Sequence, residues 1–82
     1  MPAKVFSVIP AAGGWAVQAA GGEQLMFFSG GRAEAKANQL AELARRLGDP
    51  AKVLIHDRQG RLIGQRLFPL DQQPQLVGLN GD

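Results

Sequence analysis

Residues 32–47 read RAEAKANQLAELARRL, the one stretch of this 82-residue chain with a sustained helical period. Its apolar residues recur at i, i+4, i+7, i+8, i+11 and i+14, which places them on one stripe of an amphipathic helix. The members of this stripe are Ala33, Ala37, Leu40, Ala41, Ala44 and Leu47. Because four of these six side chains are alanine methyl groups, the helix can lie close to the surface that it covers, and the flanking segments predict a sheet there.

Five short segments rich in β-branched and aromatic residues flank the helix, three before it and two after it. They are residues 4–9, 15–19, 23–28, 52–56 and 61–68. Glycine pairs, prolines and the sequence DRQG at residues 57–60 separate them and are typical of turns. The sequence therefore predicts an α+β fold of order βββαββ, in which an antiparallel sheet of about five strands carries the helix on one face.

Residues 1–69 are predicted to form this single domain. Residues 70–82 are predicted to be a C-terminal tail, flexible or loosely docked, because they are polar and contain proline and glycine. The apolar run at residues 25–28 indicates a strand that is buried on both faces or nearly so. The predicted core consists of Phe6, Val8, Val17, Phe28, Ala37, Leu40, Ala41, Ala44, Leu47, Val53 and Ile55.

Composition excludes several classes of site. The chain has no cysteine, which rules out a disulfide framework, a thiolate zinc site and a cysteine nucleophile. The N-terminal segment has too short an apolar run for a secretory signal, and no stretch reaches the roughly 18 apolar residues of a spanning helix. We therefore expect a cytoplasmic protein without a membrane partner. A chain this short buries only about 60 to 65% of its unfolded surface, so oligomerisation would add stability.

Several residues together form a pattern that resembles a known family. They are Gly14, Trp15 and Val17, then Phe28, then Glu34 and Ala35 with Ala41 and Ala44, and finally Ile55, His56, Asp57 and Gly60. Over residues 5–68 the chain resembles the small bacterial domain-of-unknown-function family 2188, which has no assigned biochemical function. The resemblance implies the architecture and no reaction. The chain departs from the family at Ser29-Gly30-Gly31, where such sequences usually have Ser or Thr with a charged residue, so Ser29 or either glycine can be the N-cap.

The only histidine, His56, lacks the neighbours that catalysis requires. Adjacent strand residues point to opposite faces, so His56 and Asp57 cannot form a dyad unless the turn begins at Asp57. One histidine and scattered carboxylates do not make a metal cluster with recognisable spacing. We therefore expect no enzymatic activity, no metal or other cofactor, and no small-molecule substrate.

Two further positions have both a structural and a functional interpretation. Ser29-Gly30-Gly31-Arg32 opens the helix, where free N–H groups can accept phosphate, but neither the P-loop nor the dinucleotide fingerprint is present and a turn is favoured. Trp15 can stack a nucleic-acid base on an open sheet face, or it can lie beneath the alanine-rich helix. Its large apolar area favours burial.

Two hypotheses of function remain, and we favour a non-enzymatic interaction module. This module would form a homodimer or bind a protein partner through an exposed sheet edge or an apolar sheet face that includes Leu54, Leu67 and Phe68. The alternative is binding of nucleic acid or another polyanion, because basic residues outnumber acidic ones eight to four between residues 32 and 66. Its candidate residues are Arg45, Arg46, Lys52, Arg58, Arg61 and Arg66. It requires the four hairpin residues to gather on the sheet face away from the helix; otherwise they form an ordinary solvated surface.

Overall fold

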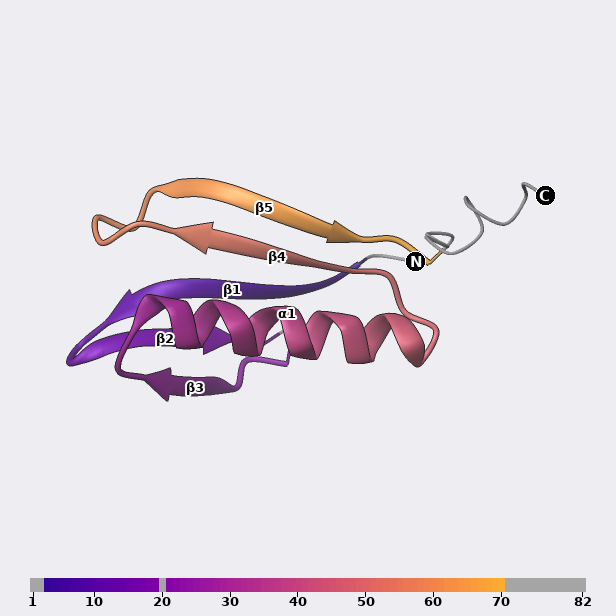
Figure 1. Ribbon diagram of the computed structural model, residues 1–82, viewed down its shortest axis with the longest axis horizontal. Helices are drawn as coiled ribbons and strands as arrows, with labels where there is room; N and C mark the ends of the chain where they lie inside the picture. Colours follow the sequence, from indigo (N-terminus) through magenta and orange to yellow (C-terminus); the bar gives the residue numbers. More distant parts are fainter. Residues whose placement is uncertain (1–2, 20, 71–82) are drawn as a thin grey trace.

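The structure, a computed structural model, describes residues 3–19 and 21–70. In chain order its elements are β1 (Lys4–Ala11), β2 (Gly14–Gln18), β3 (Gln24–Phe27), α1 (Gly30–Arg46), β4 (Ala51–His56) and β5 (Leu62–Phe68) (Figure 1). This order confirms the predicted βββαββ arrangement and the α+β class. The predicted tail, residues 70–82, lies outside the described residues except for Leu70, which is 44% exposed.

The strands form one sheet in the order β3-β2-β1-β4-β5, with β1 in the centre. Three of the four neighbouring pairs are antiparallel, but β1 and β4 are parallel. The prediction of a purely antiparallel sheet is therefore corrected at this pair. β3 runs in the same direction as β1, and α1 then returns the chain along the sheet, so β4 starts at the same end as β1 (Figure 1). The helix thus makes the crossover that a parallel pair requires.

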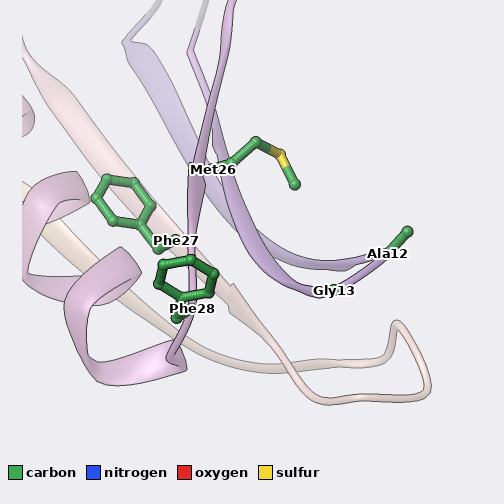
Figure 2. Close-up of a pocket in the computed structure, with 5 residues that line it drawn as sticks. All are labelled: Ala12, Gly13, Met26, Phe27 and Phe28. Carbon is green, nitrogen blue, oxygen red and sulfur yellow. The ribbon is translucent and has the colours of Figure 1, made fainter.

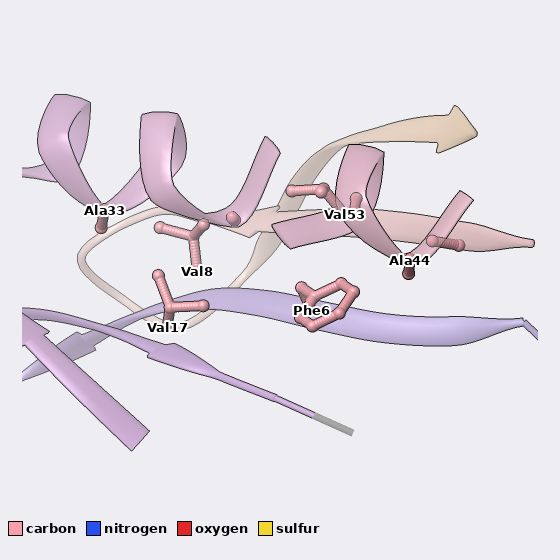
Figure 3. Close-up of a cluster of buried hydrophobic side chains, with 9 residues drawn as sticks. Phe6, Val8, Val17, Ala33, Ala44 and Val53 are labelled. Atoms are coloured by element: carbon pink, nitrogen blue, oxygen red, sulfur yellow. The ribbon is translucent and has the colours of Figure 1, made fainter. Parts of the chain in front are cut away.

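The core lies between α1 and one face of the sheet, as predicted. Ala33, Ala37 and Ala41 are completely buried, and they pack against side chains of β1, β2 and β4 (Figure 3). These partners are Phe6, Val8, Val17 and Val53. Leu40 and Ile55, also predicted in the core, are half-buried at its border. The alanine stripe therefore brings the helix close to the sheet, and the largest fully buried side chains are valines.

Two residues of the predicted core are exposed instead. The Phe28 side chain is 92% exposed and that of Leu47 is 73% exposed. Phe28 follows β3, which is an edge strand where Leu25 and Met26 are also exposed, so this apolar run is not buried on both faces. Leu47 is the C-cap of α1, where the backbone leaves the helical conformation and the period of the stripe no longer determines the side-chain direction.

Both ends of α1 have recognisable caps. Ser29 is the N-cap, and its hydroxyl oxygen accepts a hydrogen bond from the Arg32 N–H at 3.2 Å, so the helix includes both glycines that follow. At the other end Gly48 has φ +98°, and its N–H donates to the Arg45 carbonyl at 3.0 Å. The Asp49 N–H donates to the Ala44 carbonyl at 2.9 Å, which completes a Schellman motif and confirms the predicted stop.

Candidate functional site

The sheet face that α1 does not cover is defined by strand alternation. Phe6, Val8, Val17 and Val53 point to the helix, so the neighbours of each along its strand lie on the other face. The pairing register arranges these neighbours in rows across the sheet. The first row holds Met26, Ala16 and Ile9; the second Gln24, Gln18, Ser7, Leu54 and Gln65; the third Val5, Lys52 and Leu67. We call this surface the open face.

The first row continues onto β4 and β5 through a β-bulge. The register shifts between Ile55 and His56, so that Ile55 pairs with Gly64 and His56 with Leu62. Ile63 is the additional residue, and a bulge sets two residues of one strand opposite one residue of its partner. Leu62 and Ile63 therefore both lie beside His56, at the same end of the sheet as the first row.

Large exposed apolar side chains gather along this row. Ile63 is 64% exposed, Met26 and Leu62 are each 57% exposed, and Phe28, which follows the end of β3, is 92% exposed. Together with fully buried Ala16 and half-buried Ile9 in the same row, they form a set that we call the apolar stripe; its members are Ile9, Ala16, Met26, Phe28, Leu62 and Ile63. Because neighbouring strands lie about 4.8 Å apart, a row across five strands is about 20 Å long.

A hollow of about 240 Å³ lies at the β3 end of the apolar stripe (Figure 2). It is lined by Ala12, Gly13, Met26, Phe27 and Phe28. Met26 and Phe27 leave β3 on opposite sides, with Phe27 directed toward α1 (Figure 2). A cavity of about 150 Å³ is enough for benzene, so the hollow has room for an aromatic or aliphatic side chain from another molecule.

The three residues proposed from the sequence as a protein interface do not share one surface. Leu54 and Leu67 lie on the open face, where Leu67 is 63% exposed. Phe68 lies on the opposite face and packs against the core, with the Arg66 guanidinium 5.9 Å from the centroid of its ring. Neighbouring residues of a regular strand alternate between faces, so Leu67 and Phe68 are separated by the sheet.

The six basic residues proposed for polyanion binding fall into separate groups. Arg45 and Arg46 lie on α1, and both donate to the Glu42 carboxylate, with the closest contact at 2.6 Å from Arg45 Nη2. This hydrogen bond lowers the pKa of Glu42 to about 2. Of the hairpin residues, the register places Lys52 on the open face and Arg66 on the helix side. The other two, Arg58 and Arg61, lie in the β4–β5 turn.

His56 has a clear structural contact. Its Nδ1 lies 3.0 Å from the carbonyl oxygen of Val8 in the neighbouring strand. A carbonyl only accepts hydrogen bonds, so Nδ1 carries the proton and donates. The registered pairing of β1 with β4 ends at Val8 and Ile55. The imidazole therefore adds one more bond between these strands just beyond the end of their backbone pairing.

Asp57 organises the turn between β4 and β5. Its Oδ1 accepts hydrogen bonds from the backbone N–H groups of Gln59 and Arg61, both at 2.9 Å. Its Oδ2 accepts one from Arg61 Nε at 3.0 Å. The backbone hydrogen bond from Arg61 is the main cause that lowers the pKa of Asp57. The Asp57 carboxylate thus stabilises the turn that it begins, and the described side chains show no hydrogen bond between it and His56.

Trp15 lies on the helix side of the sheet, where it is half-buried and packs against the core. The start of α1 is close to it, because a Cβ on Gly30 would be 3.3 Å from the indole ring. The Arg58 guanidinium lies 5.3 Å from the centroid of the indole ring, a distance typical of a cation–π contact. Trp15 is therefore not a stacking platform on the open face.

Comparison with protein families shows which family the chain belongs to. Residues 6–67 match a family described as "Uncharacterized protein conserved in bacteria (DUF2188)". The chain belongs to this family. Its membership confirms the resemblance seen in the sequence. Neither the curated proteins nor the solved structures gave a significant match.

In this DUF2188 domain, most of the residues that carry the family pattern are explained by structure. Gly14 has φ +155°, and a Cβ there would lie 2.3 Å from the Phe27 carbonyl oxygen, so β2 and β3 can approach only with glycine at this position. His56 joins β4 to β1, and Asp57 closes the following turn. Apart from Phe28, the residues of the apolar stripe lie outside the pattern.

The apolar stripe was not predicted from the sequence. Strand alternation starting from Phe6 and Val8 indicates that Ile9 lies on the face opposite the helix, and this signal was available. The bulge that adds Ile63 was not readable, because a shift of one residue leaves no mark in the composition. Met26 was hidden within an apolar run that suggested burial on both faces.

Residues 3–19 and 21–70 contain no group of three or more His, Asp or Glu side chains placed to hold a metal ion. Within the same ranges, α1 is neither long enough nor apolar enough to cross a membrane.

Proposed function

We propose that this DUF2188 domain is a protein-interaction module that binds its partner through the open face. The observation that carries the proposal is the apolar stripe, which has exposed large side chains at both ends, Met26 on β3 and Leu62 with Ile63 on β5, at 57% to 64%. Single exposed apolar residues are ordinary, but several on one face of a small protein mark an interaction surface.

The remaining residues of the open face fit the same role. Interfaces combine an apolar centre depleted of charge with polar groups that make hydrogen bonds. Beside the apolar stripe, the second row supplies hydroxyl and amide groups from Ser7, Gln18, Gln24 and Gln65. In the three rows, Lys52 is the one side chain that carries a permanent charge. Because these groups are carried by paired strands, little backbone conformational entropy is lost on binding.

Site-specific photo-cross-linking in cells that produce this protein tests the proposal. A photoreactive amino acid is placed at Ile63 in the apolar stripe and, as a matched control, at Leu43 on α1. The two side chains are similarly exposed, at 64% and 52%, but lie on different layers. We expect discrete adducts from position 63 that disappear in Met26→Lys, and none from position 43. If position 63 yields no adduct beyond those of position 43, the open face is not the binding surface.

A second candidate is polyanion binding at the β4–β5 turn. Arg58 and Arg61 lie within four residues in this turn, and Arg58 is exposed on the ring of Trp15. Binding of nucleic acid through such residues weakens steeply with salt, because counterions are released when phosphates are neutralised. We expect Arg58→Ala to lower the affinity for single-stranded DNA and to flatten its salt dependence. Affinity that changes with neither salt nor this substitution removes the candidate.

A further inference from the structure

We infer that the partner of the open face is a second copy of this chain, and that two sheets stack to form a layered α/β/β/α dimer. The inference rests on the proposed binding through the open face and names the partner.

The core is small for a chain that folds alone. Six of the ten buried hydrophobic residues are alanine, and the other four are Phe6, Val8, Val17 and Val53. In contrast, nine large hydrophobic side chains of the described residues are exposed. Small domains with this little apolar burial gain stability from oligomerisation. Such a partner must be present whenever the chain is folded, and a second copy always meets that requirement.

The open face has a suitable size. Five strands about 4.8 Å apart, with about six residues each at about 3.3 Å per residue, cover a flat area of about 500 Å². Protruding side chains raise the accessible area above the flat area. A standard interface buries about 800 Å² on each partner, so nearly the whole open face would be used. Stacked sheets lie about 10 Å apart, which allows side chains such as Met26 and Ile63 to interdigitate.

The strand order makes the open face self-complementary. β1 is the central strand of the sheet, so a two-fold axis parallel to β1 sets β3 over the partner's β5. Each row then faces the same row of the partner. Met26 meets the partner's Leu62 and the partner's Ile63, and the glutamines of the second row meet polar or aliphatic groups. Lys52 lies in the third row, away from the apolar stripe, so no charge is buried at the centre.

The test is sedimentation velocity of the purified full chain across a range of concentrations. The wild type is expected to sediment as a dimer. Met26→Glu or Ile63→Lys alone should weaken dimerisation by on the order of a hundredfold or more, because each dimer then buries two unpaired charges. Leu43→Lys, on the helix layer, should leave the dimer intact.

Mixing the two charged variants tests the geometry itself. In a mixed dimer the new glutamate faces the new lysine across one contact, while native Met26 and Ile63 meet across the other. We expect dimers to reappear in the mixture, which also shows that each variant is folded. Failure of the mixture to dimerise, or a wild-type dimer that survives both substitutions, overturns the inference. If the wild type is a monomer but position 63 still cross-links to a different protein, only the inference that the partner is a second copy is overturned. If the wild type is a monomer and forms no adducts, the proposed function is overturned as well.

Discussion

Replacing Gly14 with alanine should be strongly destabilising, because the new methyl group has no space. Its Cβ would lie 2.3 Å from the Phe27 carbonyl oxygen, whereas ordinary van der Waals contact begins at 3.4 Å. The shift needed is 3.4 − 2.3 = 1.1 Å, and it must come from the backbone of β2 or β3. The next residue, Trp15, pairs with Phe27, so this shift opens the register where β3 ends.

Gly13 provides a matched control for the size of the effect. It also has a positive φ, +81°, but a Cβ there would meet nothing within 4 Å. Gly13→Ala costs about 1–2 kcal/mol for the left-handed conformation, and loss of unfolded-state freedom returns about 0.4–1 kcal/mol. Gly14→Ala adds backbone strain of about 1–3 kcal/mol and weakens one or two strand hydrogen bonds worth about 1 kcal/mol each. We therefore expect a net cost of about 1 kcal/mol at position 13 and about 3–6 kcal/mol at position 14.

Urea unfolding monitored by tryptophan fluorescence measures both values, since Trp15 is the only tryptophan and packs against the core. A loss of about 3–6 kcal/mol is a large part of the 5–15 kcal/mol that stabilises an ordinary domain, so the midpoint for Gly14→Ala should fall clearly below that for Gly13→Ala. If the two variants agree within about 0.5 kcal/mol at equal m-values, steric contact with β3 does not explain the glycine.

Four further predictions use the same unfolding measurement. Gly31→Ala should stabilise α1 by up to about 1 kcal/mol, since the added Cβ meets nothing within 4 Å. Gly30→Ala should stabilise it less, because the added Cβ touches the indole ring of Trp15. An equal gain at both positions would contradict that contact. His56→Ala should cost about 1 kcal/mol, whereas His56→Asn, whose amide nitrogen can replace Nδ1, should retain part of it; equal losses would argue against the bond to β1. The pKa of Glu42 is lowered from 4.5 to about 2, so the contribution of Glu42 to stability is complete above pH 4.5 and disappears as the pH falls toward 2. Glu42→Gln should remove this part of the pH dependence of stability. An unchanged profile would contradict the pairing of Glu42 with the two arginines. The pKa of Asp57 is lowered from 3.8, so its contribution to stability is likewise lost as the pH falls below that value. Asp57→Asn should flatten the pH dependence of stability in this range and yet keep the turn. The amide exchange rates of residues 59 and 61 would report whether the turn is kept.

The sequence contained most of the fold, for identifiable reasons. The alanine period specified the buried side of α1, and Gly48 with Asp49 specified its end, because these signals are local. The position of β4 in the sheet is not local. After α1 has returned the chain, β4 runs in the same direction as β1 and β3, and no single strand encodes which of these two it joins. The exposure of Phe28 depended on the same choice, because it left β3 at an edge.

The candidate site was less predictable than the fold. The sequence suggested Leu54, Leu67 and Phe68 for one apolar sheet face, and the pairing register places Leu54 and Leu67 on the open face. The alternation rule also separates Phe68 from Leu67, and the grouping of these two neglected it. Leu62 and Ile63 come together through a bulge, which is a property of the pairing of two strands and not of one sequence segment.

The family pattern and the apolar stripe are connected through the backbone, although they share few residues. The β1–β2 turn, the β4–β5 turn and the start of α1 all lie at one end of the sheet (Figure 1). Gly14 allows β3 to approach there, which fixes the position of Met26. His56 and Asp57 fix the turn from which Leu62 emerges. The residues of the pattern therefore fix the backbone that carries the apolar stripe, because they set the approach of β3 at one edge of the sheet and the β4–β5 turn at the other.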